Sequence, residues 1–243
     1  MGKARLDQLL VERGLCDSRE QAKRLILAGE VMIGTQVAAK PATQVVEDAE
    51  LTVKEKPKYV GRGGLKLEGG LDAFEIDPGG RTCLDVGAST GGFTDCLLQR
   101  GAAKVYAFDV GTNQLVWKIR QDPRVVSREK FNVRYMVPGD VGEPISLCVI
   151  DVSFISLTLI LGPVFSVLEE GGDVVCLVKP QFEVAREEVG KGGIVRDEAA
   201  RLGALDRIRE FVESGLGKCW REHIDSPIAG TDGNREFLAW LTH

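Results

Sequence analysis

An acidic residue near the end of an apolar segment precedes a glycine-rich turn between residues 82 and 94, Thr-Cys-Leu-Asp-Val-Gly-Ala-Ser-Thr-Gly-Gly-Phe-Thr. Asp85 is that residue, and a second acidic residue, Asp109, ends the next apolar segment. Glycines in such a turn let backbone amides approach a ligand at the carboxyl edge of a sheet. A carboxylate at the position of Asp109 suits ribose hydroxyls. We expect cofactor contacts from Asp85, Gly87, Ala88, Ser89, Gly91, Gly92, Phe93, Thr94, Asp109, Val110 and Asn132, the last beside an adenine.

The glycine spacing distinguishes two classes of cofactor. A dinucleotide site uses Gly-X-Gly-X-X-Gly, which brings the backbone against a pyrophosphate. This chain instead has Gly87-X-X-X-Gly91-Gly92. S-adenosylmethionine has no phosphate, and its ammonium and sulfonium groups favour an acidic strand end such as Asp85. The spacing therefore favours S-adenosylmethionine over a dinucleotide, and glycines that only form a tight turn are the third interpretation.

Four ionisable residues stand where predicted elements begin or end. They are Lys66, Asp151, Lys179 and Glu236. In an open α/β sheet, side chains at the carboxyl ends of neighbouring strands meet in one crevice. Any one of the four alone would be read as a surface ion pair, but together they predict a catalytic cluster.

These residues resemble the Lys-Asp-Lys-Glu tetrad of the FtsJ-type ribose 2'-O-methyltransferases, and Arg62-Gly-Gly-Leu-Lys66-Leu matches their Arg-X-X-X-Lys-Leu pattern. Asp151-Val-Ser-Phe154 and Lys179-Pro-Gln-Phe182-Glu are closer still to the TlyA family. That resemblance spans nearly the whole chain. It implies an S-adenosylmethionine-dependent enzyme that methylates cytidine in ribosomal RNA, with ribosomal RNA or a ribosomal subunit as partner. The short segments before Arg5 and after Glu236 resemble compact members and imply large-subunit RNA.

The cluster suits proton removal from a ribose hydroxyl, which is a poor nucleophile until a base takes its proton. A second positive charge nearby and partial burial make a lysine release its own proton more readily. We assign Lys179 as the base, with Lys66 beside it. Asp151 and Glu236 would orient the two lysines and balance their charge.

Strand and helix patterns alternate after residue 63. This alternation predicts a Rossmann-like, doubly wound α/β sheet with helices on both faces. Strands are expected at 82–86, 105–109, 125–127, 147–151, 173–178, 218–224 and 236–241, and helices at 63–74, 92–100, 113–120, 155–168 and 198–214.

A small α+β domain is expected before this sheet. Leu6, Leu9 and Leu10 form one helical stripe, and Ala22, Leu25 and Ile26 form a second, preceded by a capping-box start at Ser18. Short strands are expected at 31–33, 36–38 and 51–53. The segment resembles the S4-type RNA-binding module, which implies RNA contacts from its basic face. RNA contacts are expected from Arg5, Arg19, Lys23 and Arg24, and in the second domain from Arg62, Lys130, Arg134 and Phe154.

The expected domains are residues 1–56 and 65–243, joined by a linker at 57–64 that would couple RNA binding to Lys66. Residues 183–197, rich in glycine and charge, are expected to form a mobile loop beside the site.

Composition limits the remaining functions. The net charge is −5, with 12 Lys and Arg against 10 Asp and Glu in residues 1–70, so any RNA-binding charge is local. Six scattered cysteines and two histidines lack zinc-ligand spacing, and we expect no metal. No apolar run is long enough to span a membrane, which predicts a cytoplasmic protein. The alternatives are a membrane-active protein, since relatives are often named haemolysin, and an RNA-binding protein without catalysis.

Overall fold

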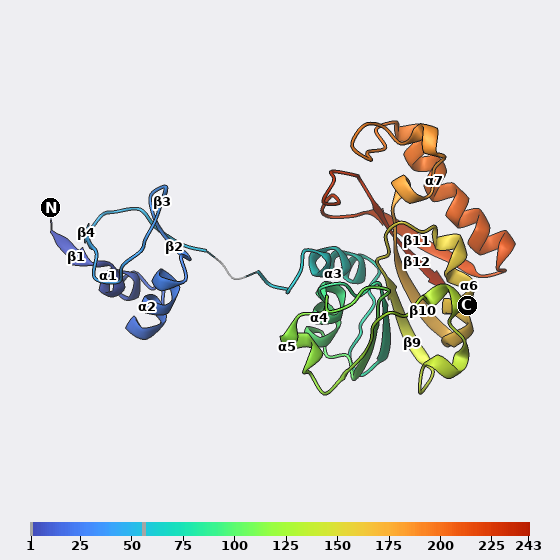
Figure 1. Cartoon of the computed structure of the whole chain (residues 1–243), viewed down its shortest axis with the longest axis horizontal. Coiled ribbons are helices and arrows are strands. Elements are labelled where there is room, and N and C mark those ends of the chain that lie inside the picture. The colour runs from blue at the N-terminus through green and yellow to red at the C-terminus, as the bar shows by residue number, and fades with distance from the viewer. Residues whose placement is uncertain (1, 55–56) are drawn as a thin grey trace. The chain divides into compact units, whose positions relative to one another are not determined.

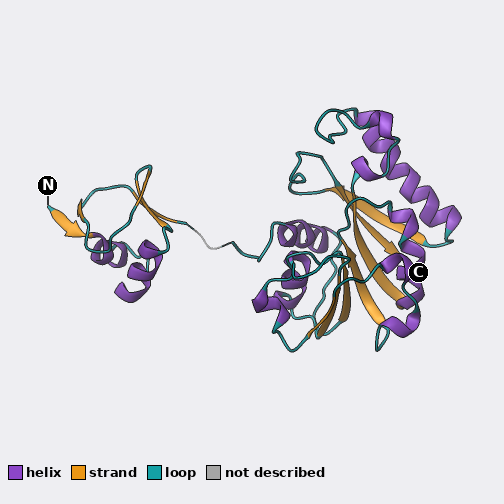
Figure 2. Cartoon of the chain, in the orientation of Figure 1, coloured by secondary structure: helices purple, strands orange, loops and turns teal. Residues whose placement is uncertain are grey.

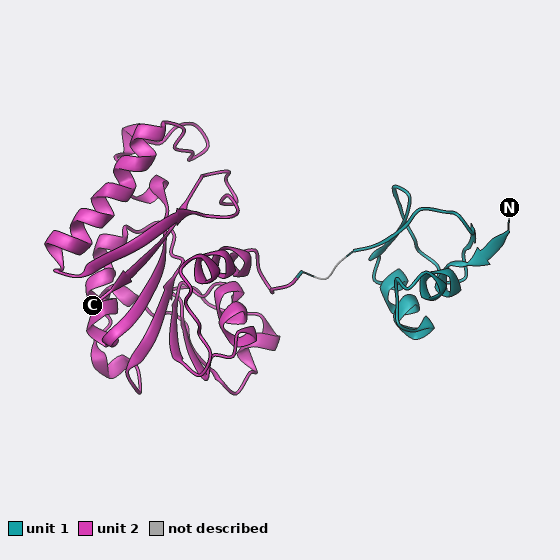
Figure 3. Ribbon diagram, turned by 180° about the vertical axis from the view of Figure 1, so that it is seen from behind, with its two compact units in different colours: residues 1–57 teal, residues 58–243 magenta. Residues whose placement is uncertain are grey.

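The computed structural model describes residues 2–54 and 57–243, and the chain divides into two compact units after Pro57 (Figure 3). The first unit packs two helices against short antiparallel strand pairs. Strand β1 pairs with β4, and β2 lies between β3 and β5. Its elements are β1 (Lys3–Arg5), α1 (Leu6–Glu12), α2 (Arg19–Leu27), β2 (Val31–Ile33), β3 (Gln36–Val37), β4 (Gln44–Val46) and β5 (Leu51–Val53).

Both predicted helical stripes are buried in the core of this first unit, together with Val31 and Val45. Helix α2 starts where the sequence predicts, because the Ser18 hydroxyl accepts a hydrogen bond from the backbone N–H of Gln21 at 3.2 Å. Strands β1 and β4 were not expected, since they pair only with each other and a pairing between residues 3 and 46 leaves no local pattern.

The second unit is built on a seven-stranded sheet, in the order β11-β12-β10-β9-β6-β7-β8 (Figures 1 and 2). Strand β12 pairs antiparallel with both β10 and β11, whereas β10, β9, β6, β7 and β8 are parallel. This is the expected α/β fold. The strands are β6 (Thr82–Val86), β7 (Lys104–Phe108), β8 (Val125–Arg128), β9 (Ile145–Ile150), β10 (Leu168–Val178), β11 (Cys219–Asp225) and β12 (Phe237–Thr242).

Helices cover both faces of the sheet, and each face has its own apolar core (Figure 1). Leu67 of α3 and Leu97 of α4 pack on one face, while Leu161 of α6 and Leu205 of α7 pack on the other. The helices are α3 (Gly63–Ala73), α4 (Gly92–Gln99), α5 (Trp117–Arg120), α6 (Leu161–Val167) and α7 (Glu198–Glu210), with a π-helical turn at Phe211–Gly215 and short 3-10 helices η1 (Val133–Tyr135), η2 (Pro138–Asp140), η3 (Leu157–Leu159), η4 (Pro180–Phe182) and η5 (Arg186–Glu188).

Two predicted helices are shorter than expected. The helix expected at 155–168 starts only at Leu161, after the separate turn η3. The helix expected at 113–120 is reduced to α5, because Asn113 has a left-handed φ of 54° that no helix contains.

The segment expected as a linker belongs largely to the second unit. Tyr59 is buried, and the backbone N–H of Val60 donates to Asp95 Oδ2 at 2.9 Å. Helix α3 begins at Gly63. An aromatic ring and a backbone hydrogen bond therefore fix residues 59–63 to this unit, which glycine-rich sequence alone does not reveal.

Candidate active site

The glycine turn after β6 closely approaches the segment that follows β9. Gly87 has a φ of 85°, which disfavours other residues. A Cβ there would overlap the carbonyl oxygen of Asp151. Gly91, with a φ of 98°, precedes the first residue of α4. The turn therefore needs glycine both for its backbone conformation and for its contact with Asp151.

Asp85 lies beneath this turn and is fully buried. The hydroxyl of Thr94 donates to its Oδ2 at 2.6 Å, and Oδ1 has no hydrogen-bond partner among the described residues. Burial raises the pKa of Asp85 to about 7, and the nearby charges of Asp151 and Asp109 act in the same direction. The hydrogen bond between Thr94 and Asp85 joins the end of β6 to the start of α4 across the turn, and neither these two residues nor Gly91 lines either of the two cavities described below.

A cavity of about 430 Å³ opens beside the turn. Five predicted cofactor residues line it: Gly87, Ser89, Asp109, Val110 and Asn132. The Asp109 carboxylate accepts hydrogen bonds from the backbone N–H groups of Ser89 at 2.8 Å and Gly111 at 2.7 Å. Asp109 thus holds the turn in place as well as facing the cavity.

The same cavity has lining residues that the sequence did not single out. They lie within a few residues of predicted ones. Apart from Ser153, which stands inside the Asp151-Val-Ser-Phe154 motif, no motif marks them, because their role comes from the fold of the strand ends. They include Gln114, Phe131, Val133, Ser153, Ile155 and Ile160.

A smaller cavity of about 120 Å³ adjoins the other side of the turn. Ala88, Gly92 and Phe93, all predicted cofactor residues, line it. Arg62, predicted to bind RNA, also lines it, and its Nη2 donates to the carbonyl oxygen of Ala229 at 3.1 Å. Asp151 lines both cavities.

The four ionisable residues form two buried or partly buried ion pairs. Lys66 Nζ lies 2.5 Å from Glu236 Oε2, and Lys179 Nζ lies 2.6 Å from Asp151 Oδ1. Lys179 also donates to the hydroxyl of Ser153 at 3.1 Å. Each lysine therefore pairs with one of the two carboxylates that were expected to orient the lysines. Ser153 lies inside the Asp151-Val-Ser-Phe154 motif but was given no role, because a single serine carries no separate signal.

Strand order explains why these residues meet. Asp151 and Lys179 directly follow the adjacent parallel strands β9 and β10, so both lie at the carboxyl edge. Strand β12 runs the opposite way and pairs Phe237 with Val178, so Glu236 lies at this same edge. Lys66 reaches the edge from α3, which packs against the sheet on the same side as α4.

Phe154 is an exposed aromatic residue beside the larger cavity. Its side chain is 91% exposed, its φ is 64°, and its ring centroid lies 5.2 Å from that of Phe182. Lys130 and Arg134 are also exposed, and the backbone N–H of Arg134 donates to Asn132 Oδ1 at 3.0 Å, next to the cavity.

In the first unit, two predicted RNA-binding arginines converge on one carboxylate. Arg5 and Arg19 form ion pairs with the fully buried Asp7 at 3.1 and 3.0 Å. The hydrogen bond from Arg5 lowers the pKa of Asp7. Asp7 therefore places two partly exposed guanidinium groups together. Lys23 instead pairs with Glu20 at 2.8 Å, and Arg24 is exposed on the same helix.

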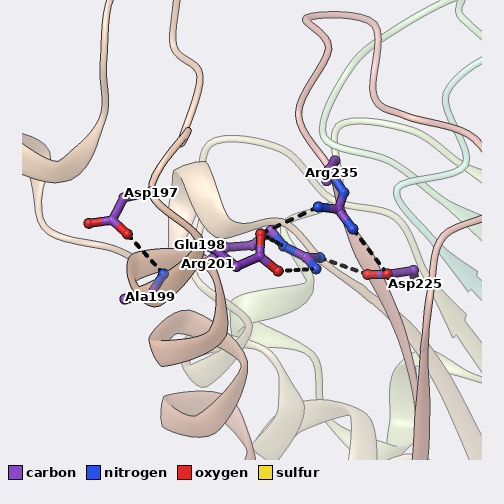
Figure 4. A network of polar contacts seen from close by, with 6 residues as sticks. All are labelled: Asp197, Glu198, Ala199, Arg201, Asp225 and Arg235. Atoms are coloured by element: carbon purple, nitrogen blue, oxygen red, sulfur yellow. Dashed lines mark hydrogen bonds and ion pairs between the residues drawn. The ribbon is translucent and has the colours of Figure 1, made fainter.

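A polar network links the start of α7 to the strands next to Glu236 (Figure 4). Arg201 is buried and bonds Glu198 and Asp225, and Arg235 bonds the same two carboxylates. The Arg201 guanidinium also lies 4.0 Å from the ring centroid of Phe237. These contacts fix the beginning of β12.

The loop expected at residues 183–197 is attached to the segment before Glu236. The buried Asn234 accepts from the backbone N–H of Val195 at 3.0 Å and donates to the carbonyl of Gly193 at 2.9 Å. Across the described part of the chain, no helix has the length and apolar character to cross a bilayer, and no His, Cys, Asp and Glu cluster is arranged to hold a metal ion.

Each of the two units matches a known protein family. The family model of the FtsJ-like methyltransferases matches residues 59–243, and that of the S4 domain matches residues 4–51. The 16S/23S rRNA (cytidine-2'-O)-methyltransferase TlyA of Mycobacterium tuberculosis is 46% identical over 98% of this chain and 90% of its own. Hemolysin A of Brachyspira hyodysenteriae is 45% identical over 97% of this chain and 98% of its own.

A solved structure agrees over the full length. A candidate hemolysin from Streptococcus thermophilus is 48% identical, with a TM-score of 0.75 over 99% of this chain and 88% of that one. Similarity of this extent covers both units and the residues between them. The chain therefore belongs to the TlyA family, in which an S4 domain precedes an FtsJ-like methyltransferase domain.

Proposed function

We propose that this protein transfers a methyl group from S-adenosylmethionine to the 2'-hydroxyl of a ribose in ribosomal RNA, with cytidine as the target nucleoside. The observation that carries the proposal is the pair of ion pairs, Lys66 with Glu236 and Lys179 with Asp151, at the edge where the glycine turn lies. The target is supported by the rRNA (cytidine-2'-O)-methyltransferase activity in the name of a relative that is 46% identical.

The residues around the glycine turn fit S-adenosylmethionine. Gly87 leaves no room for a side chain beside Asp151, so ligand atoms can approach the backbone there. Asp109 and Asp151, which line the larger cavity, make this region negative, which favours a ligand with ammonium and sulfonium groups. Asp109 would receive the ribose hydroxyls, and Val110 and Asn132 would contact the adenine. When bound, the cofactor supplies a methyl group activated by the positive sulfur.

Lys179 would accept the proton of the attacking ribose hydroxyl at Nζ. The Asp151 carboxylate at 2.6 Å stabilises the positive charge that this amine acquires, and Ser153 fixes its direction. The pair formed by Lys66 and Glu236 lies beside it at the same sheet edge and would orient the ribose. Once Lys179 has taken the proton, two positive and two negative groups stand together, which limits the cost of burying any one of them.

RNA would be held in two places. Arg5 and Arg19 present guanidinium groups suited to phosphate oxygens. In the second unit, the exposed ring of Phe154 offers a surface on which a base can stack. Lys130 and Arg134 would contact the RNA backbone nearby.

Purified protein should transfer labelled methyl groups from S-adenosylmethionine to isolated 30S or 50S subunits, and mapping of the 2'-O-methylated nucleotides should identify a cytidine. Cells that lack the gene should lose the same modification and regain it on complementation. A methyl group on a base, or transfer to neither subunit, would contradict the proposal. The two subunit arms also decide whether large-subunit RNA is the sole substrate.

Lys179→Ala should lower the methyl-transfer rate by at least about 100-fold, the usual contribution of a general base. Cofactor affinity, measured by calorimetry, should remain near that of the wild type. Lys104→Ala is a matched control, because Lys104 also pairs with a carboxylate, Glu143, but at the start of β7. Full activity of Lys179→Ala would rule out the assigned base.

A further inference from the structure

Glu183 is a buried carboxylate outside the four-residue cluster. It directly follows η4, four residues after Lys179, and is 8% exposed. Its Oε1 accepts from the backbone N–H of Leu157 at 2.9 Å, and its Oε2 accepts from the Ser156 hydroxyl at 2.5 Å. Burial raises its pKa, and these two hydrogen bonds oppose that change. Glu183 therefore joins the turn after β10 to the segment after β9.

The same two parts of the chain are joined a second time. Lys179 contacts Asp151 and Ser153 at the start of the segment 151–157. Glu183 contacts Ser156 and Leu157 at its end. We name residues 151–157 the Phe154 segment, because Phe154 stands between these two attachments.

The conformation of Phe154 needs such support. Its φ of 64° lies in the left-handed region, which bulky side chains rarely adopt. Its ring contacts Phe182 but is otherwise 91% exposed, so little packing holds it. Conformations of this kind persist where surrounding contacts fix them, and they cluster at functional sites. Attachment on both sides supplies that constraint.

We propose that Glu183 is a positioning residue, which holds the Phe154 segment against the turn formed by Lys179 and η4 and so sets where Phe154 meets the target RNA. The inference rests on the proposed function. Replacement of Glu183 by an aliphatic residue would remove a buried charge but leave the Leu157 N–H without its acceptor. A carboxylate at this position therefore serves the geometry of the segment.

A double-mutant cycle on the intact chain tests this role. Glu183→Ala should slow single-turnover methyl transfer to RNA about 10- to 100-fold, as expected for a misplaced substrate contact, with cofactor affinity within about threefold. Glu183→Gln keeps an acceptor for Leu157 and a donor for Ser156, and should stay within about threefold of the wild-type rate. In a Phe154→Ala background, Glu183→Ala should slow transfer by no more than about twofold. Equal slowing in both backgrounds would overturn the proposal, since Glu183 would then act independently of Phe154.

Backbone amide exchange gives a second readout that needs no activity. Glu183→Ala should speed exchange in residues 151–157 and leave β6 unchanged, whereas unchanged exchange in that segment would overturn the proposal. Glu143→Gln is the control for both assays, since Glu143 accepts from Lys104 at the opposite sheet edge. Should Glu183→Ala fail to fold, Ser156→Ala removes the hydrogen bond from the Ser156 hydroxyl to Glu183. It then replaces Glu183→Ala in the double-mutant cycle with Phe154→Ala, and the same outcomes support or overturn the proposal. Wild-type protein that methylates no RNA would refute the proposed function, while exchange would still decide the attachment.

Discussion

Asp85→Asn should change how the stability of the protein depends on pH. Asp85 is fully buried, and its folded-state pKa is raised from 3.8 to about 7. An unfolded chain ionises this carboxyl near its ordinary pKa, so between the two values the unfolded state is ionised while the folded state must hold a proton. The contribution of Asp85 to the free energy of unfolding is therefore complete below the lower value and is lost as pH rises to the higher one.

The size of this effect follows from the shift. Each pKa unit corresponds to about 1.4 kcal/mol, so the rise from 3.8 to about 7 corresponds to a loss of about 4 kcal/mol. An asparagine cannot ionise, and its carbonyl can still accept from Thr94. The difference in free energy of unfolding, variant minus wild type, should therefore increase by up to about 4 kcal/mol between about pH 4 and pH 8.

Urea unfolding of both proteins across this pH range measures the difference directly. Asp122→Asn is a control of opposite sign, because the hydrogen bond from Arg124 lowers the pKa of Asp122. Stability from Asp122 is present at neutral pH and is lost as pH falls, so removing it should cost more at high pH than at low pH. If the free energies of unfolding of the wild type and Asp85→Asn differ by the same amount at every pH, burial does not hold Asp85 as a neutral acid.

Three further substitutions test other parts of the structure. Gly87→Ala should lower cofactor affinity at least about tenfold by calorimetry, since its Cβ would overlap a backbone oxygen. The control Gly80→Ala shares a positive φ but meets nothing within 4 Å, so it should lose only about 1 kcal/mol of stability. Arg201→Ala should lower the free energy of unfolding by about 2 kcal/mol, through lost packing and charge over Phe237, and Arg201→Met should recover about half of it. A loss equal in both variants would exclude packing as the cause. Arg5→Ala should reduce the slope of log affinity for RNA against log salt by about 1, and an unchanged slope would place Arg5 outside the RNA contact.

The sequence was sufficient to predict a buried face or the place of a residue in the sheet where one physical rule dominates. The stripes of Leu6 with Leu10 and Ala22 with Ile26 predicted buried helix faces, because helical periodicity leaves few other ways to bury them. The positions of Asp151 and Lys179 at strand ends followed from the edge rule for parallel sheets. These rules place the residues, whereas their chemical roles stay predictions.

Other features depend on contacts between distant segments, which no local pattern records. The helix expected from residue 155 begins later because Glu183 bonds the N–H of Leu157 and the hydroxyl of Ser156. Glu183 lies 28 residues further along the chain than residue 155. Which carboxylate pairs with which lysine was not assigned from the sequence, since Lys66 meets Glu236 only through the antiparallel β12. A linker was expected at residues 57–64, but the burial of Tyr59 attaches most of that segment to the second unit.

The position of β12 has a consequence for biosynthesis. It is the last of the seven strands to be translated, yet it lies between β10 and β11 in the sheet. Until β12 emerges from the ribosome, β11 has no neighbour in the sheet and one side of β10 stays unpaired. Glu236 precedes this strand by one residue, so the ion pair with Lys66 forms only when the sheet closes. A nascent chain therefore completes the seven-stranded sheet and brings Glu236 to Lys66 in the same step.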